Sequence, residues 1–596
     1  MLKKMAAFLL AVPVICLFAA CGSPSYGKTD LPAQLEQAET GDPVPEETEA
    51  PDGIVTNLEK IDMSKWQYNT DDDVYYQIGI SYCETPADER YETLAIFVPG
   101  AYFFGTGNGD GTYTCIVNAT AMVNGYAAKT APIVMPIETP GYSAMAALAA
   151  YTNVTQYTGE GFVYVHAGCR GRDAGAPAGV TDLKAAIRYL RYNDDIIAGS
   201  AERIFVFGMS GGGAQSALVG ATGDSALYEP YLEQIGAVRG VSDSVYGSMC
   251  WCPITNLDSA DAAYEWMMGA TRSGLSAEEQ EISDALAAAF AGYINQAGIK
   301  DEDGKVLTLE ASENGVYQAG SYYDYMVGVI EKSLNDFLTD TEFPYTASAS
   351  SKMGRGPGGM GGFGGPGNPN DGAGDVPYEK KDGIERIEPA NAATASGTYE
   401  TVKDYIDALN AGGTWITYDA AENRATITGI EAFAKALKHA SKSLGAFDQL
   451  NAGQGENILF GYGDGKGAHF DAALFDILKA LGNEYAPDFA ADLRKTDSAG
   501  YTVNQRLNMY TPLYYLLESQ EGYGASAPAK YWRIRSGIAQ SDTSVTTEVN
   551  LALALMNYDG VESVDFATVW GQQHVKAERT GDSATNFINW VHDCLA

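Results

Sequence analysis

Basic residues and histidine are scarce in this chain, and their scarcity excludes several classes of function. The 596 residues include 38 Lys and Arg against 77 Asp and Glu, and the formal net charge is −39. A protein that binds nucleic acid without regard to its sequence needs Lys and Arg to displace counterions from phosphates. Docking of a polybasic patch on an anionic membrane needs the same residues. The composition therefore predicts no nucleic-acid partner and no membrane docking through charge.

Cysteine is also sparse, and its spacing forms no metal-binding framework. Among the eight cysteines, Cys250 and Cys252 are too close together for a zinc knuckle and lack a second ligand pair. The acidic run at 301–304 resembles the end of a calcium loop, but Ile299 stands where the first carboxylate ligand belongs. A turn with its acids in water is the better interpretation. We predict no metal site and no cofactor.

The N-terminal segment is typical of bacterial export. Two lysines precede an apolar run at 5–17, which is too short for a comfortable membrane span. Small residues then lead to Cys21 in the pattern of a lipobox, whose cysteine becomes the lipidated first residue of the mature protein. The alternative is an ordinary secretory peptide that is cut after Ala20. We favour a signal peptide over 1–20 with lipidation at Cys21.

Residues 21–60 are rich in Pro, Glu, Asp, Gly and Ser and poor in apolar residues. Such a segment cannot bury enough surface to fold, so it is expected to be an acidic tether between the lipid and a folded domain. The prediction is an exported lipoprotein at the cell surface, which touches the membrane only through its lipid anchor.

Apolar runs that alternate with helical patterns predict an α/β fold. Continuous apolar strands with helices between them indicate a parallel sheet that is covered on both faces. The segment between about 257 and 504 departs from this pattern. It contains a capping box at Ser276, an expected hairpin at 414–428 and a Gly-rich stretch at 354–374 that is expected to be mobile. The expected strands are 94–98, 132–135, 162–165, 204–207, 531–535 and 564–570, and the expected helices include 545–557 and the C-terminal segment.

This pattern predicts an α/β-hydrolase fold with a large inserted lid domain. The predicted hydrolase core is 61–256 together with 505–596, and the lid is 257–504.

A G-x-S-x-G turn at Ser210 is the sharpest chemical signal in the chain. It follows the apolar strand 204–207 and precedes a helical segment, as in the nucleophile turn of serine hydrolases. Small neighbours are needed there because the turn is strained and lies against adjacent elements. A Gly-rich phosphate turn is the alternative, but no G-K-[ST] ending follows. We predict that Ser210 is a nucleophile, with the N–H of Gly211 as one oxyanion donor.

A serine nucleophile needs a base, and the chain offers five histidines. The base is expected in the loop after the last strand, because α/β-hydrolases supply serine, acid and histidine in that order. Only His574 fits this order. Strand-end packing is expected of His166 and solvent exposure of His439. His469 lies in a loop, where it serves substrate binding or has no role, and His592 lies on the expected final helix.

The acid is expected in the loop that follows strand 531–535. In many such enzymes it stands three residues after the strand's glycine, and here that position holds Gln540. Asp542 is the only carboxylate in the loop, since Glu548 lies a turn and a half into the next helix. We assign Asp542 as the acid that orients His574. Its alternative role is that of a helix N-cap.

The second oxyanion donor is expected in the loop after strand 132–135. Pro140 has no N–H to donate, which leaves Thr139 or Gly141. We place it at Gly141.

Several longer blocks resemble the bacterial (subtype B) tannase-like and feruloyl-esterase-like α/β-hydrolases. They are GCRGR at 168–172, DLKAAIRYLRYN at 182–193, the Ser210 turn, CPITNLD at 252–258, AAYEW at 262–266 and the segment 570–574. The resemblance covers most of residues 65–596. It implies hydrolysis of galloyl or related hydroxybenzoyl esters, small-molecule phenolic substrates, through an acyl-enzyme.

The resemblance also implies which residues hold the phenolic hydroxyls. In the family a lid lysine, a lid glutamate and an aspartate near the triad acid do so, and the matching positions are Lys442, Glu456 and Asp542. The family often has two acids in a D-x-D arrangement, but Gln540 replaces the first here. Asp542 therefore remains a candidate for the triad, for the substrate or for both.

Two other functions remain open. The same fold supports esterases and peptidases of other substrate classes, because specificity lies in the lid pocket rather than in the fold. The substitution at Gln540 also leaves room for a catalytically inactive binding lipoprotein.

Overall fold

A nine-stranded sheet forms the centre of the computed structural model, which describes residues 53–312, 317–347 and 397–596. Its strand order is β1-β2-β3-β9-β8-β10-β11-β16-β17. The first three strands and β9 pair antiparallel, and all neighbours from β9 to β17 pair parallel. The strands are β1 (Gln67–Asn69), β2 (Val74–Ser81), β3 (Thr93–Pro99), β8 (Ile133–Ile137), β9 (Val163–Ala167), β10 (Ile204–Met209), β11 (Gly247–Trp251), β16 (Tyr531–Gly537) and β17 (Ser563–Val569).

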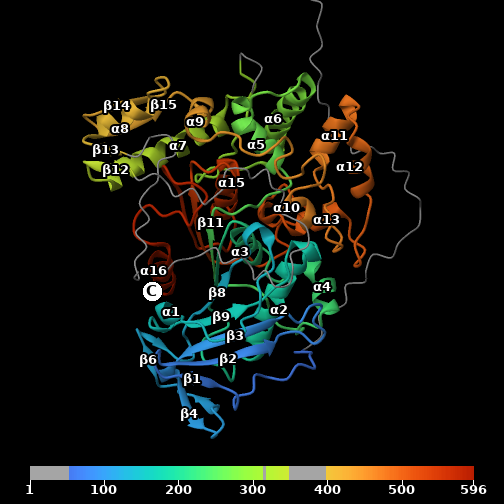
Figure 1. The fold of residues 1–596 in the computed structure, drawn as a ribbon, viewed down its shortest axis with the longest axis vertical. Coiled ribbons are helices and arrows are strands. Elements are labelled where there is room, and N and C mark those ends of the chain that lie inside the picture. The colour runs from blue at the N-terminus through green and yellow to red at the C-terminus, as the bar shows by residue number, and fades with distance from the viewer. Residues whose placement is uncertain (1–52, 313–316, 348–396) are drawn as a thin grey trace, which may run out of the picture. The chain divides into compact units, whose positions relative to one another are not determined.

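Helices cover both faces of this sheet, as Figure 1 shows. Alternate residues of β10 enter two different cores: Ile204 and Val206 pack with α2, α3 and α15, while Phe205 and Phe207 pack with α16. Burial on both faces explains why the strand is apolar throughout. The predicted α/β-hydrolase fold is confirmed. The helices beside the sheet are α1 (Thr155–Thr158), α2 (Ala178–Tyr192), α3 (Gly211–Ala221), α4 (Glu229–Gln234), α15 (Val545–Met556) and α16 (Ser583–Leu595).

A mainly helical insertion separates β11 from β16. The described residues lie in one compact unit, and one apolar core runs from the sheet into the insertion. In Figure 1 the insertion is coloured green through orange. Its helices are α5 (Ala260–Met268), α6 (Ala277–Ala297), α7 (Ser321–Asp340), α8 (Val402–Leu409), α9 (Ile430–Leu437), α10 (Gly455–Leu459), α11 (Ala472–Leu481), α12 (Ala486–Asp492), α13 (Val503–Met509) and α14 (Pro512–Leu516).

Two local signals in the insertion correctly predicted the elements that they mark. The capping box at Ser276 opens α6, and the expected hairpin is present around Asn423. Four two-stranded sheets complete the fold: β4 (Phe103–Gly107) with β5 (Tyr113–Val117), β6 (Met122–Val123) with β7 (Tyr126–Ala127), β12 (Tyr345–Ala347) with β13 (Gly397–Tyr399), and β14 (Ile416–Asp419) with β15 (Arg424–Ile427).

Some predictions lie outside the described residues. These are the signal peptide at 1–20, lipidation at Cys21, most of the tether and the Gly-rich stretch at 354–374. Within the described ranges, none of the helices has both the length and the apolar character that a bilayer crossing requires. The six cysteines of the same ranges are unpaired thiols.

Candidate active site

Ser210 stands at the turn between β10 and α3 in a strained backbone conformation. Its φ is 61° and its ψ is −124°, a region that non-glycine residues rarely occupy. The surrounding backbone holds the turn: the Ser210 N–H donates to the Trp251 carbonyl over 3.0 Å, and the Ser210 carbonyl accepts from the Ala214 N–H over 2.9 Å. The turn therefore places Ser210 at the N-terminus of α3, where the helix dipole favours negative charge.

The glycines around Ser210 are required by close backbone contacts. A Cβ on Gly212 would lie 2.1 Å from the Ile137 carbonyl oxygen, and one on Gly208 would lie 2.4 Å from the Gly212 carbonyl oxygen. A Cβ on Gly211 would lie 2.4 Å from the Tyr142 nitrogen. The helix thus packs directly against the loop that follows β8.

That loop brings a second glycine to the turn. Gly141 has a φ of 56°, and its nitrogen lies 3.1 Å from the Cβ position of Gly211. The Gly141 carbonyl accepts from Arg172 Nη1 over 2.8 Å, and the neighbouring Tyr142 N–H is engaged by the Thr139 carbonyl. The backbone nitrogen of Gly141 therefore lies close to Gly211 at the start of α3.

His574 lies in the loop after β17, which packs against the loop after β16. The Ile538 N–H donates to the Val569 carbonyl at the end of β17, and the Ala539 N–H donates to the Gln572 carbonyl in the His574 loop, each over 3.0 Å. A Cβ on Gly537 would lie 2.0 Å from the Gln573 carbonyl oxygen. His574 itself is partly buried, with 19% of its side chain exposed.

The structure corrects one predicted hydrogen bond. His574 Nδ1 lies 2.5 Å from Gln540 Oε1, whereas Asp542 Oδ2 is 3.8 Å from the same nitrogen. The packed loops point position 540 inward, and Asp542, two residues later, is 44% exposed. Asp542 therefore acts on His574 through its charge rather than through a hydrogen bond. It is not the N-cap of α15 either, since Ser544 is.

Burial and nearby charges set the pKa of His574. Burial lowers this pKa below its ordinary value. The Asp542 carboxylate raises it, and the positive charges of Lys442 and Lys438 lower it. The neutral imidazole, the form that accepts a proton, is therefore favoured at neutral pH.

The two predicted lid residues lie at different parts of this site. Lys442 sits 3.7 Å above the Phe447 ring, its carbonyl accepts from Arg272 Nη1 over 2.7 Å, and its charge acts on His574. Glu456 is buried on α10, and its charge, together with burial, raises the pKa of Tyr142 in the oxyanion loop. Lys442 thus lies within electrostatic reach of His574, and Glu456 within electrostatic reach of Tyr142 in the loop after β8.

The sequence did not single out Lys438, which precedes the exposed His439. Lys438 is fully buried at the end of α9, and its Nζ donates to the Gln540 carbonyl. Burial lowers the pKa of Lys438 to about 8. Nothing in the local sequence distinguishes it from its exposed neighbours.

The other four histidines have structural surroundings. His166 is buried with Nε2 2.8 Å from the Ala146 carbonyl, and His439 is exposed. His469 is buried and contacts Asp448 over 2.7 Å. His592 lies 2.7 Å from the Tyr126 hydroxyl. His574 is the one that joins the Gln540 loop.

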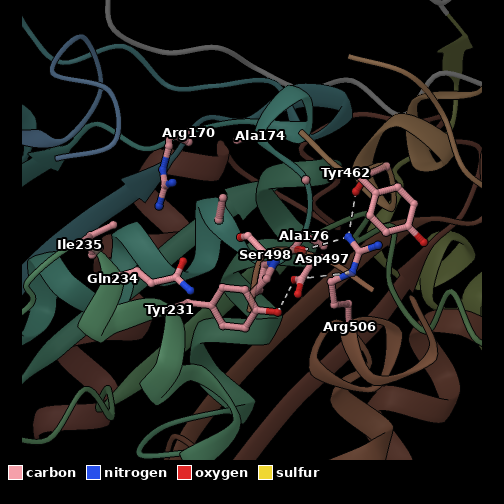
Figure 2. Close-up of a pocket in the computed structure, with 14 residues that line it drawn as sticks. Arg170, Ala174, Ala176, Tyr231, Gln234, Ile235, Tyr462, Asp497, Ser498 and Arg506 are labelled. Atoms are coloured by element: carbon pink, nitrogen blue, oxygen red, sulfur yellow. Dashed lines mark hydrogen bonds and ion pairs between the residues drawn. The ribbon is translucent and has the colours of Figure 1, made fainter. Parts of the chain in front are cut away.

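A cavity of about 130 Å³ lies between the start of α2 and the insertion. Figure 2 shows residues that line it. Arg506, which is buried there, donates to the carbonyls of Ala176 and Gly461, and the Tyr231 hydroxyl donates to Asp497. These polar groups join the insertion to the core. Neither Ser210 nor His574 lines the cavity, and the described residues contain no cluster of three potential metal ligands.

Comparisons with known proteins agree with this geometry. A family model described as BD-FAE matches residues 122–288. The native tannin acyl hydrolase of Lactobacillus plantarum is 26% identical with a TM-score of 0.64, covering 90% of this chain and 99% of its own. A Fusobacterium nucleatum tannase is 27% identical with a TM-score of 0.62, covering 92% of this chain and 99% of its own. A tannin acyl hydrolase in complex with ethyl gallate is 27% identical with a TM-score of 0.62, covering 87% of this chain and 94% of its own. No curated protein matches the chain.

The serine turn, its sheet and these likenesses define an α/β-hydrolase. The chain is similar to the tannase-like and feruloyl-esterase-like hydrolases. Its relatives support a carboxylic ester hydrolase that acts on phenolic esters.

Proposed function

We propose that this protein is a serine esterase that hydrolyses galloyl or related hydroxybenzoyl esters through an acyl-enzyme. The strained turn at Ser210, packed against the Gly141 loop, is the observation that carries the proposal. A serine at such a turn, beside two backbone N–H groups, matches the needs of acyl transfer.

The mechanism uses Ser210 and His574 in both halves of the reaction. His574 Nε2 takes the Ser210 proton as Oγ attacks the ester carbonyl carbon, and the N–H groups of Gly211 and Gly141 hold the resulting oxyanion. The imidazolium then gives its proton to the departing alcohol, which leaves the acyl group on Ser210. Water repeats the sequence and releases the phenolic acid.

Lys442, Glu456 and Asp542 are proposed to bind the phenolic hydroxyls. A lysine and two carboxylates near one site suit a ring with several hydroxyl groups, which both donate and accept hydrogen bonds. The tannin acyl hydrolases solved with ethyl gallate and with 3,4-dihydroxybenzoate are similar in fold and support this substrate class.

Glu456→Gln is expected to weaken the binding of hydroxylated substrates selectively. KM for methyl gallate should rise about tenfold, because a hydrogen bond to a charged group is worth about 1.5–3 kcal/mol. KM for methyl benzoate should change little. Glu431→Gln, at an exposed glutamate on α9, is the matched control. Equal losses on gallate and benzoate would assign Glu456 a structural role instead.

The pH profile of kcat/KM is expected to report the pKa of His574 and the effect of nearby charges on it. Activity needs the neutral imidazole, so it falls as pH drops through the His574 pKa, which lies below its ordinary value of about 6.5. Lys442→Met removes a positive charge and should move this limb to higher pH. Asp542→Asn removes a negative charge and should move it to lower pH. Shifts in the same direction for both variants would contradict this electrostatic account.

Substrate comparison tests the proposed function against other hydrolases of this fold. Turnover is measured on methyl gallate, methyl ferulate, p-nitrophenyl acetate and an aminoacyl anilide. We expect methyl gallate to be a good substrate. An enzyme that is active on the others but inert toward gallate would overturn the galloyl assignment.

A second candidate function, an inactive binding lipoprotein, is favoured by the amide of Gln540 where family members often carry an acid. A fluorophosphonate probe distinguishes the two. Labelling of the wild-type protein is expected if Ser210 is activated, and an unlabelled wild-type protein would favour binding without catalysis.

We also propose that the enzyme acts at the cell surface, anchored through lipidation at Cys21. The lipobox-like residues before Cys21 and the acidic segment at 21–60 support this placement. A phenolic ester would then be cleaved outside the cell.

A further inference from the structure

A buried polar network lies behind His574. Gln540 Oε1 faces His574, and Gln540 Nε2 is within hydrogen-bond distance of three oxygens: Ser536 Oγ at 2.8 Å, Thr543 Oγ1 at 3.0 Å and Glu548 Oε1 at 2.8 Å. The four residues behind the imidazole are at most 3% exposed. The network therefore meets the solvent only through His574.

The orientation of the Gln540 amide decides which imidazole nitrogen carries the proton. The amide oxygen only accepts and the NH₂ only donates. When the oxygen faces His574, Nδ1 must carry the proton, and Nε2 is free to accept one from Ser210. When the NH₂ faces His574, Nδ1 accepts and the proton sits on Nε2. That second tautomer cannot act as the base.

Glu548 removes this ambiguity. An ionised carboxylate offers only acceptors, so it requires the NH₂ of Gln540 to face it. The hydroxyls of Ser536 and Thr543 each donate to the same Glu548 oxygen over 3.0 Å, and they therefore present lone pairs to Gln540 Nε2. All three neighbours of the amide nitrogen are acceptors. The amide oxygen is then left for His574.

We propose that Glu548 is a positioning residue that sets the tautomer of His574 through Gln540. The inference rests on the proposed function, in which His574 is the base. In this arrangement Glu548 takes the place of an acid that bonds His574 directly. The Gln540 amide lies between the Glu548 carboxylate and the imidazole. Glu548 touches neither the substrate nor the reacting atoms.

Charged groups around the network govern the ionisation of Glu548. Burial raises the pKa of Glu548 to about 7, while the Lys438 charge and the bonds from Ser536 and Thr543 lower it. Lys438 faces the network from α9, and its own pKa is also influenced by Asp542 and Cys252. Protonated Glu548 could donate to the amide oxygen and release the constraint. Activity should therefore depend on Glu548 remaining ionised.

The test removes the carboxylate at position 548 and then introduces one at position 540. Glu548→Gln is expected to lower kcat on the best ester roughly 10- to 100-fold, part of the contribution that general base catalysis makes, with KM little changed. Adding Gln540→Glu to this variant should restore much of kcat. In that double variant a carboxylate accepts from Nδ1 in either orientation, and the amide at 548 donates to it. Glu562→Gln, at a half-exposed glutamate, is the matched control.

Each result decides the inference. An unchanged kcat in Glu548→Gln, or no recovery in the double variant, would overturn it. Nitrogen NMR of the wild-type protein gives an answer that needs no variant to fold: we expect the His574 proton on Nδ1, and a proton on Nε2 would overturn the inference. Fluorophosphonate labelling of the wild-type protein separates the failures, because an unlabelled protein refutes the proposed function itself.

Discussion

Ser210→Ala should abolish ester hydrolysis, with kcat falling by a factor on the order of 10³ or more. The variant keeps the oxyanion donors and the binding pocket but has no atom to form the acyl-enzyme, so only the residual stabilisation by those groups remains. The fluorophosphonate label should disappear with the activity. Substrate binding should persist, since Ser210 contributes little to the proposed contacts with the phenolic ring.

The control for this variant is a serine of similar size elsewhere in the fold. Ser276→Ala removes a helix cap of α6, so it should cost about 1 kcal/mol of stability and leave kcat unchanged. A Ser210→Ala protein that still hydrolyses gallate esters at the wild-type rate would show that another group is the nucleophile.

Gly212→Ala should strongly destabilise the fold around the Ser210 turn. The added Cβ would lie 2.1 Å from the Ile137 carbonyl oxygen, which belongs to the backbone of β8 and cannot turn aside. Either α3 or the strand must move, and overpacking of this kind costs about 1–3 kcal/mol or more. The same movement separates Ser210 from the Gly141 loop. We therefore expect a lower thermal midpoint and, in the folded fraction, a lower kcat.

Gly292→Ala is the matched control, because it makes the same substitution inside helix α6. No atom lies within 4 Å of the Cβ position there. Alanine should stabilise that helix by up to about 1 kcal/mol and leave kcat unchanged. Equal effects of the two substitutions on the thermal midpoint would show that contact with β8 does not explain the role of Gly212.

The parts of the fold that local sequence specifies were predicted correctly. β10, the Ser210 turn and α3 follow one another within about twenty residues, and each carries its own apolar pattern. β11 was missed, because its sequence of Gly, Ser, Met, Cys and Trp has neither alternation nor β-branched residues. It becomes a strand because β10 and β16 pair with it on both sides. Tertiary pairing of this kind leaves no local signal.

The candidate site shows the same division. Ser210 and His574 were predicted from motif and chain order, and the structure places the Gln540 loop against His574. The hydrogen bond from His574 to Gln540 rather than to Asp542 was not expected, because composition favoured the only carboxylate in the loop. Glu548 and Lys438 contribute through burial, and burial of a single charged residue depends on what packs around it. Sequence patterns of one helix do not contain that information.

The acyl-enzyme tests the central claim most directly. The wild-type protein is mixed with methyl gallate, quenched in acid during turnover, and measured by intact and peptide mass spectrometry. We predict a covalent adduct with the mass of one galloyl group on the peptide that contains Ser210, and no adduct in Ser210→Ala. Turnover without any adduct under conditions that trap the intermediate, or an adduct on another residue, would contradict the account.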